Sequence, residues 1–142
     1  MVSVKELFLL VGGPFEEQLT SSKIRLEIDC HPLLLIQADG NMMQQVLINL
    51  VKNAIEAFGE KPDPVIRLTA QSTAENTVIE VIDNGNGIPA VAMENIFVPF
   101  FTTKETGSGI GLSLSRQIIR MHGGSLDVQS VPGSHTIFTI KI

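Results

Sequence analysis

Two asparagines in the middle of the chain have the side chains and spacing of a cation site. Asn49 and Asn53 lie four residues apart in a segment with helical periodicity, so they share one face. Two carboxamides that point the same way offer oxygen ligands to a hard cation such as Mg²⁺, which usually keeps several waters and phosphate oxygens. A pair of solvated polar side chains is the plainer interpretation, and the spacing alone does not exclude it.

A carboxylate among glycines forms the second candidate. Residues 83–87 read DNGNG and directly follow the apolar run at 77–82. An ionised carboxylate only accepts hydrogen bonds, so Asp83 could accept from an exocyclic amine. Gly85 and Gly87 permit positive φ and the close approach of a flat ligand. A glycine-rich turn without function is the alternative.

A glycine-rich helix start is the third candidate. Residues 107–114 read GSGIGLSL, with Gly107, Gly109 and Gly111 ahead of a helical pattern. Unpaired backbone N–H groups at a helix start can bind an anion, although one G-x-G pattern is a weak signal. Lys104, in the aperiodic stretch before it, could approach phosphates as a mobile charge. A flexible helix start and a solvated lysine are the alternatives.

The elements that must position these residues follow from hydrophobic periodicity. Asp39 is a candidate N-cap, Gly59 a candidate stop, and a helix over 40–58 carries an apolar stripe. The stripe contains Met43, Val46, Leu47, Leu50, Val51, Ala54 and Phe58. Further helices are expected over 3–10, 15–22, 89–96 and 110–122, and strands over 23–29, 33–39, 64–72, 76–83, 125–130 and 135–142. This order predicts an α/β two-layer sandwich, a mixed sheet with helices on one face.

Length and composition exclude several classes of protein. The 142 residues suit one domain, and no repeat, linker or low-complexity tract divides residues 1–142. A net charge of −5 without a dense Lys/Arg run argues against a nucleic-acid partner. No apolar stretch reaches the length of a membrane span, and the N-terminus is interpreted as a helix, not a signal peptide. Cys30 is the only cysteine and is expected to be a half-buried strand residue in a reducing compartment.

Taken together and in order, the motifs resemble a known family. NLVKNA, DNGNGIP, FVPFFTTK, GSGIGL and GGSLDVQS…SHTIF follow one another over residues 49–138. This series resembles the catalytic ATP-binding domain of bacterial sensor histidine kinases. Their superfamily, with its Bergerat-type fold and mostly antiparallel sheet, includes type II topoisomerases, mismatch-repair ATPases and a heat-shock chaperone. The resemblance covers nearly the whole chain, most weakly the helical residues 1–23, and implies an ATP lid over 96–108.

The resemblance also implies a role for each matching residue. Asn53 matches the Mg²⁺ ligand, Asn49 lies near the phosphates as a catalytic residue with Lys104, and Asp83 matches the acid that reads adenine. Thr136 matches a threonine that shares a water with that acid. The other residues expected at the nucleotide are Gly85, Gly87, Ile88, Gly107, Gly109, Ile110, Gly111 and Leu112. Phe97, Phe100 and Phe101 match a phenylalanine motif, in which at least two rings are expected to serve as lid hinge or core packing.

Departures from the family pattern refine the expected function. Many members carry an aromatic ring where this chain has Glu56-Ala57, so adenine must stack elsewhere. The ATP-hydrolysing branches use a glutamate base where this chain has Asn49, which cannot take a proton. This favours transfer of the γ-phosphate from Mg-ATP to a histidine over hydrolysis. A self-contained ATPase or clamp, a serine-kinase relative and a non-catalytic nucleotide sensor are the alternatives.

The histidines indicate where the phosphate acceptor lies. His31, His122 and His135 are expected to be structural, with a cationic His122 suiting the end of its helix. None has the setting of the family's phosphoacceptor, so that histidine is expected on an upstream dimerisation domain outside this chain. A response regulator is the expected indirect partner. The domain is expected in the cytoplasm without membrane contact, which leaves open a membrane anchor in the full-length protein.

Overall fold

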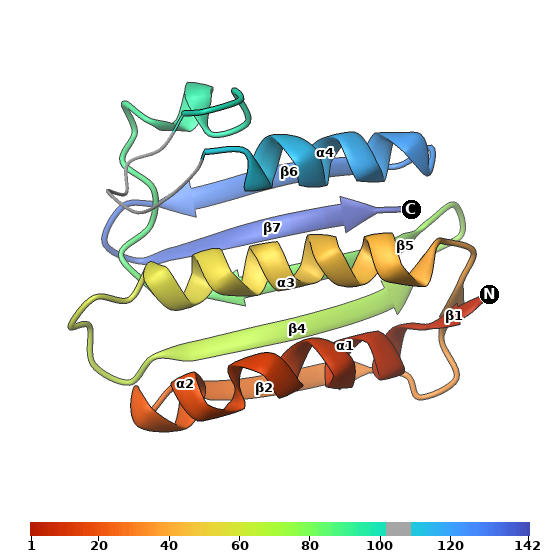
Figure 1. Ribbon diagram of the computed structural model, residues 1–142, viewed down its shortest axis with the longest axis horizontal. Helices are drawn as coiled ribbons and strands as arrows, with labels where there is room; N and C mark the ends of the chain where they lie inside the picture. Colours follow the sequence, from red (N-terminus) through yellow and green to blue (C-terminus); the bar gives the residue numbers. More distant parts are fainter. Residues whose placement is uncertain (102–108) are drawn as a thin grey trace.

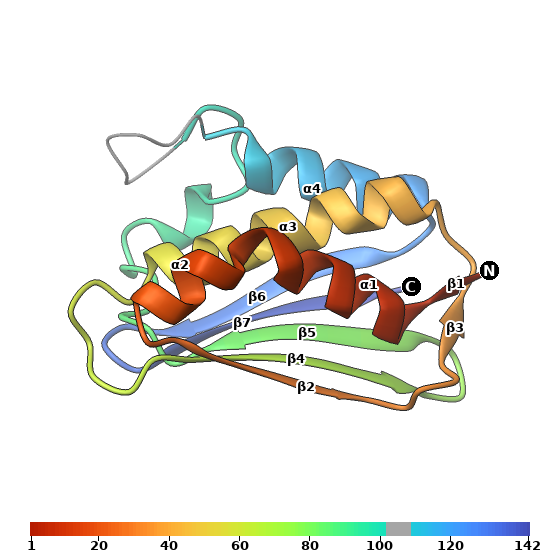
Figure 2. The same cartoon turned by 60° about the horizontal axis from the view of Figure 1, so that its bottom comes forward.

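A five-stranded sheet carries helices on one of its faces (Figures 1 and 2). The computed structural model describes residues 1–101 and 109–142. The strands are β1 (Val2–Ser3), β2 (Arg25–Cys30), β3 (Leu35–Ile36), β4 (Val65–Ser72), β5 (Thr77–Asp83), β6 (Ser125–Val131) and β7 (His135–Lys141). The helices are α1 (Val4–Gly12), α2 (Glu16–Ser21), α3 (Gly40–Glu56) and α4 (Gly111–Met121), with short 3₁₀ turns η1 (Gly13–Phe15) and η2 (Met93–Asn95).

The sheet has the strand order β2-β4-β5-β7-β6, in which only β2 and β4 run parallel. A parallel pair needs a crossover connection, and α3 lies in the connection between β2 and β4. The other neighbours form antiparallel hairpins or, in β5 and β7, an antiparallel pair distant in sequence. The predicted two-layer α/β sandwich with a mixed, mostly antiparallel sheet is confirmed.

The long helix α3 lies over the middle of the sheet, with α1 and α4 on either side (Figure 1). Asp39 caps it as expected, because its Oδ1 accepts a hydrogen bond from the Met42 N–H at 3.0 Å. Every residue of the predicted apolar stripe is buried. Burying one such Leu or Val side chain contributes about 1.5–3 kcal/mol, so this stripe anchors α3 to the sheet.

Two predicted elements are wrong in extent. Of the strand expected over 33–39, only β3 forms, and it pairs with β1 in a separate two-stranded sheet. Leu33, in the turn after Pro32, is 78% exposed, so the apolar run is not a buried strand. The helix expected over 89–96 is reduced to turns and η2, in which the Ala92 and Asn95 N–H groups donate to carbonyls three residues back.

Two side chains predicted to be structural also have defined surroundings. His122 Nε2 accepts a hydrogen bond from the Asp39 N–H at 3.1 Å, and Nδ1 lies 2.8 Å from the Ile118 carbonyl oxygen. With the Asp39 N–H donating to Nε2, Nδ1 is the ring atom that can donate to the Ile118 carbonyl oxygen. Cys30 is half-buried, and burial raises the pKa of its thiol. Across residues 1–101 and 109–142, none of the helices combines the length and apolarity needed to cross a membrane.

Candidate functional site

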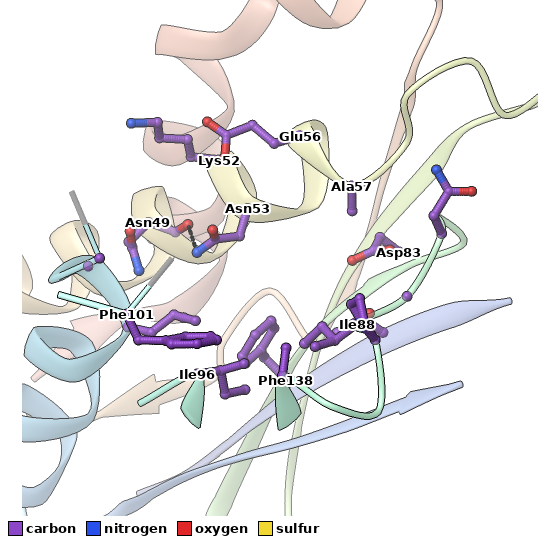
Figure 3. Close-up of a pocket in the computed structure, with 18 residues that line it drawn as sticks. Asn49, Lys52, Asn53, Glu56, Ala57, Asp83, Ile88, Ile96, Phe101 and Phe138 are labelled. Carbon is purple, nitrogen blue, oxygen red and sulfur yellow. Dashed lines mark hydrogen bonds between the residues drawn. The ribbon is translucent and has the colours of Figure 1, made fainter. Parts of the chain in front are cut away.

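A cavity of about 380 Å³ lies between α3, the glycine loop after β5, the start of α4 and the strand β7 (Figure 3). Asn49 and Asn53 line it from α3, whereas Asp83 and Ile88 line it from the other end. The full lining comprises Asn49, Lys52, Asn53, Glu56, Ala57, Asp83, Asn86, Gly87, Ile88, Pro89, Ala92, Ile96, Phe101, Gly109, Gly111, Leu112, Thr136 and Phe138.

The two asparagines of α3 have their amide nitrogens committed to the protein. Asn49 Nδ2 donates to Ser115 Oγ on α4 at 3.2 Å, and Asn53 Nδ2 donates to the Asn49 backbone oxygen at 3.0 Å (Figure 3). The second bond sets the orientation of the Asn53 carboxamide, because a flipped amide would place its oxygen against the Asn49 carbonyl oxygen. The Oδ1 atoms are therefore the atoms of these groups that can serve as ligands to a hard cation.

The start of α4 has glycine where a side chain would not fit. A Cβ at Gly111 would overlap the Asn49 carboxamide, whose Oδ1 occupies that space. Gly109 has φ of +75°, and a Cβ there would overlap the backbone of Phe100. The first backbone N–H groups of α4 have no partner within the helix, so this edge of the cavity suits an anion.

Asp83 and Thr136 form the opposite end of the site. They are register partners on β5 and β7, and each is only 3% exposed. Asp83 Oδ1 accepts a hydrogen bond from the Gly85 N–H at 2.9 Å. A Cβ at Gly85 would lie 2.9 Å from the same carboxylate oxygen, so the loop folds onto Asp83 only because residue 85 is glycine. This end therefore offers hydrogen-bond acceptors, held in place by the chain.

Ser130 links this end to the neighbouring loop. Its Oγ accepts a hydrogen bond from the Ile88 N–H at 2.7 Å and lies 2.9 Å from Thr136 Oγ1. The same oxygen lies 3.0 Å from the His135 carbonyl oxygen. The hydroxyl thus fixes the position of Ile88 relative to Thr136.

Apolar side chains form the walls between the two polar ends. Ala57, Ile88, Ile96, Phe101 and Phe138 line the cavity (Figure 3). They could contact a flat ring from several sides, although α3 has no aromatic residue in the cavity. Burial of the faces of a ligand of this kind is driven mainly by the hydrophobic effect, whereas the few polar groups set its orientation.

The structure brings most of the predicted site residues together. Those that line the cavity are Asn49, Asn53, Asp83, Gly87, Ile88, Gly109, Gly111, Leu112 and Thr136. Gly85 does not line the cavity but donates its N–H to the Asp83 carboxylate, whereas Ile110 is exposed and lines a separate surface groove. Lys104 and Gly107 lie outside the described residues, as do residues 102–108 of the expected lid.

The three phenylalanines of the third motif have different surroundings. Phe97 packs against the core and has the Arg116 guanidinium 4.2 Å from its ring centroid. Phe101 lines the cavity. Phe100 is 78% exposed and has φ of +67°, and its N–H donates to the Gly109 oxygen at 2.8 Å.

Sequence reasoning missed several lining residues, such as Phe138, and also Ser115, Ser130 and Lys61, which bond to residues of the site without lining the cavity. Ser115 contacts a residue 66 positions away, and Lys61 donates to backbone oxygens 24 to 73 positions away. No local pattern marks such partners, because they meet only when the sheet and helices assemble. Across residues 1–101 and 109–142 there is no cluster of three or more His, Cys, Asp and Glu side chains that could hold a metal ion.

Comparison with known proteins gives a consistent result. Residues 38–142 match the family model described as histidine kinase-, DNA gyrase B- and HSP90-like ATPase. The sensor histidine kinase ZraS of Escherichia coli O157:H7 is 44% identical over 105 residues, which are 74% of this chain and 22% of ZraS. The C4-dicarboxylate transport sensor protein DctB of Rhizobium meliloti (strain 1021) is 42% identical over 109 residues, 75% of this chain and 17% of DctB. The chain thus spans about a fifth of the length of these relatives.

A solved structure resembles almost the whole chain. The nucleotide-free catalytic domain of histidine kinase ThkA superimposes with a TM-score of 0.88 at 36% identity, covering 99% of this chain and 92% of that domain. This agreement extends the likeness beyond residues 38–142 to the N-terminal helices.

Proposed function

The chain belongs to the histidine kinase-, DNA gyrase B- and HSP90-like ATPase family, and from that premise we propose that it is the catalytic ATP-binding domain of a sensor histidine kinase. It binds Mg-ATP in the cavity between α3 and the glycine loop and donates the γ-phosphate to a histidine. The observation that carries this proposal is the convergence of Asn49, Asn53, Asp83 and Thr136 on one cavity.

The Asp83 end suits adenine. Adenine presents an exocyclic amine, which is a donor, whereas guanine presents a carbonyl oxygen at the same place. A buried carboxylate that already accepts the Gly85 N–H can still accept from that amine, because each oxygen has two acceptor sites. The apolar walls of Ala57, Ile88 and Phe138 then contact the faces and edge of the ring.

The α3 and α4 end suits the triphosphate and its metal. A bound Mg²⁺ would supply positive charge that offsets part of the charge of the triphosphate. Asn53 is the proposed ligand through Oδ1, since its amide nitrogen is held by the Asn49 oxygen. Asn49 Oδ1 faces Gly111, where the backbone N–H groups of α4 begin, and so lies where phosphates and helix start meet. We include Gly107 and Lys104 in the proposed phosphate site from the sequence motif.

Asn49 favours phosphate transfer over hydrolysis. A hydrolytic site needs a group that takes a proton from water, and a carboxamide cannot do so. Glu56 is the carboxylate of α3 that lines the cavity. It lies next to Ala57, whereas Asn49 is at the opposite end of the part of α3 that lines the cavity. Phosphoryl transfer itself depends mainly on positioning and charge stabilisation, which the described residues can supply.

The rest of the signalling pathway lies outside this chain. We propose that the acceptor histidine belongs to an upstream dimerisation domain, and that a response regulator receives the phosphate in turn. The protein acts in the cytoplasm, with any membrane anchor in another part of the full-length protein.

Calorimetry with Mg²⁺ and a non-hydrolysable ATP analogue tests the proposal. We expect the wild-type chain to bind, Asn53→Ala to lose the magnesium-dependent part of the affinity, and Asp83→Asn to lose preference for adenine over guanine. Unchanged affinity in both variants would refute the site. Steady-state ATP hydrolysis that Asp83→Asn abolishes would instead favour a self-contained ATPase.

A further inference from the structure

Lys61 makes three hydrogen bonds to backbone oxygens near the Asp83 end of the cavity, which is the end where we propose that the purine binds. Its Nζ donates to the carbonyl oxygens of Gly85 at 2.9 Å, Gly133 at 2.8 Å and Ser134 at 3.1 Å. An ammonium group has three N–H donors and no acceptor, so these bonds use its full capacity. Among the described residues, no carboxylate lies within ion-pair distance of Lys61. The cation is therefore held by peptide dipoles instead of by an acidic side chain.

These bonds join three segments that are distant in sequence. They are the loop after α3 (57–61), the glycine loop (83–87) and the turn between β6 and β7 (131–134). Asn86 contributes to the same junction, because its N–H donates to the Ala57 oxygen at 2.9 Å and its oxygen accepts from the Gly133 N–H at 2.6 Å. Among residues 1–101 and 109–142, Lys61 is the one side chain with hydrogen bonds to both other segments.

The junction reaches Asp83 through Gly85. The Gly85 N–H donates to the Asp83 carboxylate, and the Gly85 oxygen accepts from Lys61. Displacement of Gly85 would thus disturb the carboxylate that we propose to read adenine. The contact between Lys61 and Gly85 is partly buried, where a charge-assisted hydrogen bond is stronger than in water.

We infer that Lys61 is a positioning residue for purine recognition, acting on Asp83 through the backbone of Gly85. This inference rests on the proposed function, because it assumes that adenine binds at Asp83. Lys61 lies outside every motif of the family resemblance and does not line the cavity, so its effect must pass through the glycine loop.

The test compares Lys61→Met, which keeps most of the apolar stem without the donors, with the wild-type chain. Lys141→Met is the matched control, because Lys141 is an exposed lysine at the far end of β7. Calorimetry gives the Kd of AMP-PNP and of GMP-PNP for each variant. We expect Lys61→Met to weaken AMP-PNP binding about tenfold and to lower the preference for adenine, whereas Lys141→Met matches the wild type. Lys61→Arg, which retains the charge, should recover part of the loss.

A double-mutant cycle separates positioning from general destabilisation. If Lys61 acts through Asp83, Lys61→Met has a smaller effect on the Kd in the Asp83→Asn background than in the wild type. Equal effects in both backgrounds, or an unchanged adenine preference in Lys61→Met, would overturn the inference. If Lys61→Met does not fold, Lys61→Gln takes its place in the cycle.

The outcomes also distinguish the inference from the proposed function. Wild-type binding that Asp83→Asn weakens, together with a Lys61→Met variant like the wild type, refutes only the role of Lys61. A wild-type chain that binds neither analogue refutes both.

Discussion

Gly85 is the position at which a single methyl group should damage the purine end most directly. A Cβ at residue 85 would lie 2.8 Å from the Ala57 oxygen and 2.9 Å from Asp83 Oδ1. Real Cβ atoms essentially never approach other heavy atoms within 3.0 Å, and ordinary contact begins at 3.4 Å. In Gly85→Ala, the loop or its neighbours must therefore move by about half an ångström. The backbone itself tolerates alanine, because Gly85 does not have a positive φ.

The expected cost follows from the contacts that this movement disturbs. Overpacking of a well-filled site typically costs about 1–3 kcal/mol of stability. The same shift weakens the bond from the Gly85 N–H to the Asp83 carboxylate, and a hydrogen bond to a charged group contributes about 1.5–3 kcal/mol. We therefore expect AMP-PNP affinity to fall by about tenfold or more, in addition to a lower free energy of unfolding.

Calorimetry and urea unfolding measure the two effects separately. Gly13→Ala is the matched control, because a Cβ at Gly13 meets nothing within 4 Å and its φ of −55° suits any residue. The control should bind AMP-PNP like the wild type and unfold at an equal or higher urea concentration. A Gly85→Ala variant with wild-type affinity and stability would show that the loop does not hold Asp83 as described.

Three further substitutions test other parts of the structure. Gly111→Ala should abolish magnesium-dependent binding of AMP-PNP, measured by calorimetry, because the new Cβ displaces the Asn49 carboxamide. A variant that binds normally and only gains about 1 kcal/mol of helix stability would contradict this. Ser115→Ala removes the partner of the Asn49 amide and should weaken the same binding about threefold to tenfold, whereas an unchanged magnesium dependence would dismiss that role. His122→Leu removes the acceptor for the Asp39 N–H and should lower the free energy of unfolding by about 1–3 kcal/mol. A variant that unfolds at the same urea concentration as the wild type would contradict this role of His122.

The parts of the fold that depend on local pattern could be predicted from the sequence. The apolar stripe of α3 repeats at helical spacing, and the hairpin strands alternate with period two, so their buried faces follow from the residues themselves. The motifs around Asn53, Asp83 and Gly111 left plain alternatives open one by one, and one nucleotide site was implied only by their combined resemblance to a known family.

Features that depend on assembly could not be predicted in the same way. Leu35 and Ile36 belong to an apolar run, yet they pair with β1, whose residues lie more than 30 positions away in the sequence. The contacts of Lys61 and Ser115 join residues that no sequence spacing relates. His122 was expected to be structural, but its partner, the Asp39 N–H, lies 83 positions away and could not be identified from the sequence.

The most direct test of the proposed nucleotide site is a crystal structure of this chain with Mg²⁺ and AMP-PNP. The predicted result places the adenine amine at the Asp83 carboxylate, the ring between Ile88 and Phe138, and the metal at Asn53 Oδ1. A purine bound at any other surface, with the cavity between α3 and the glycine loop empty, would contradict the account.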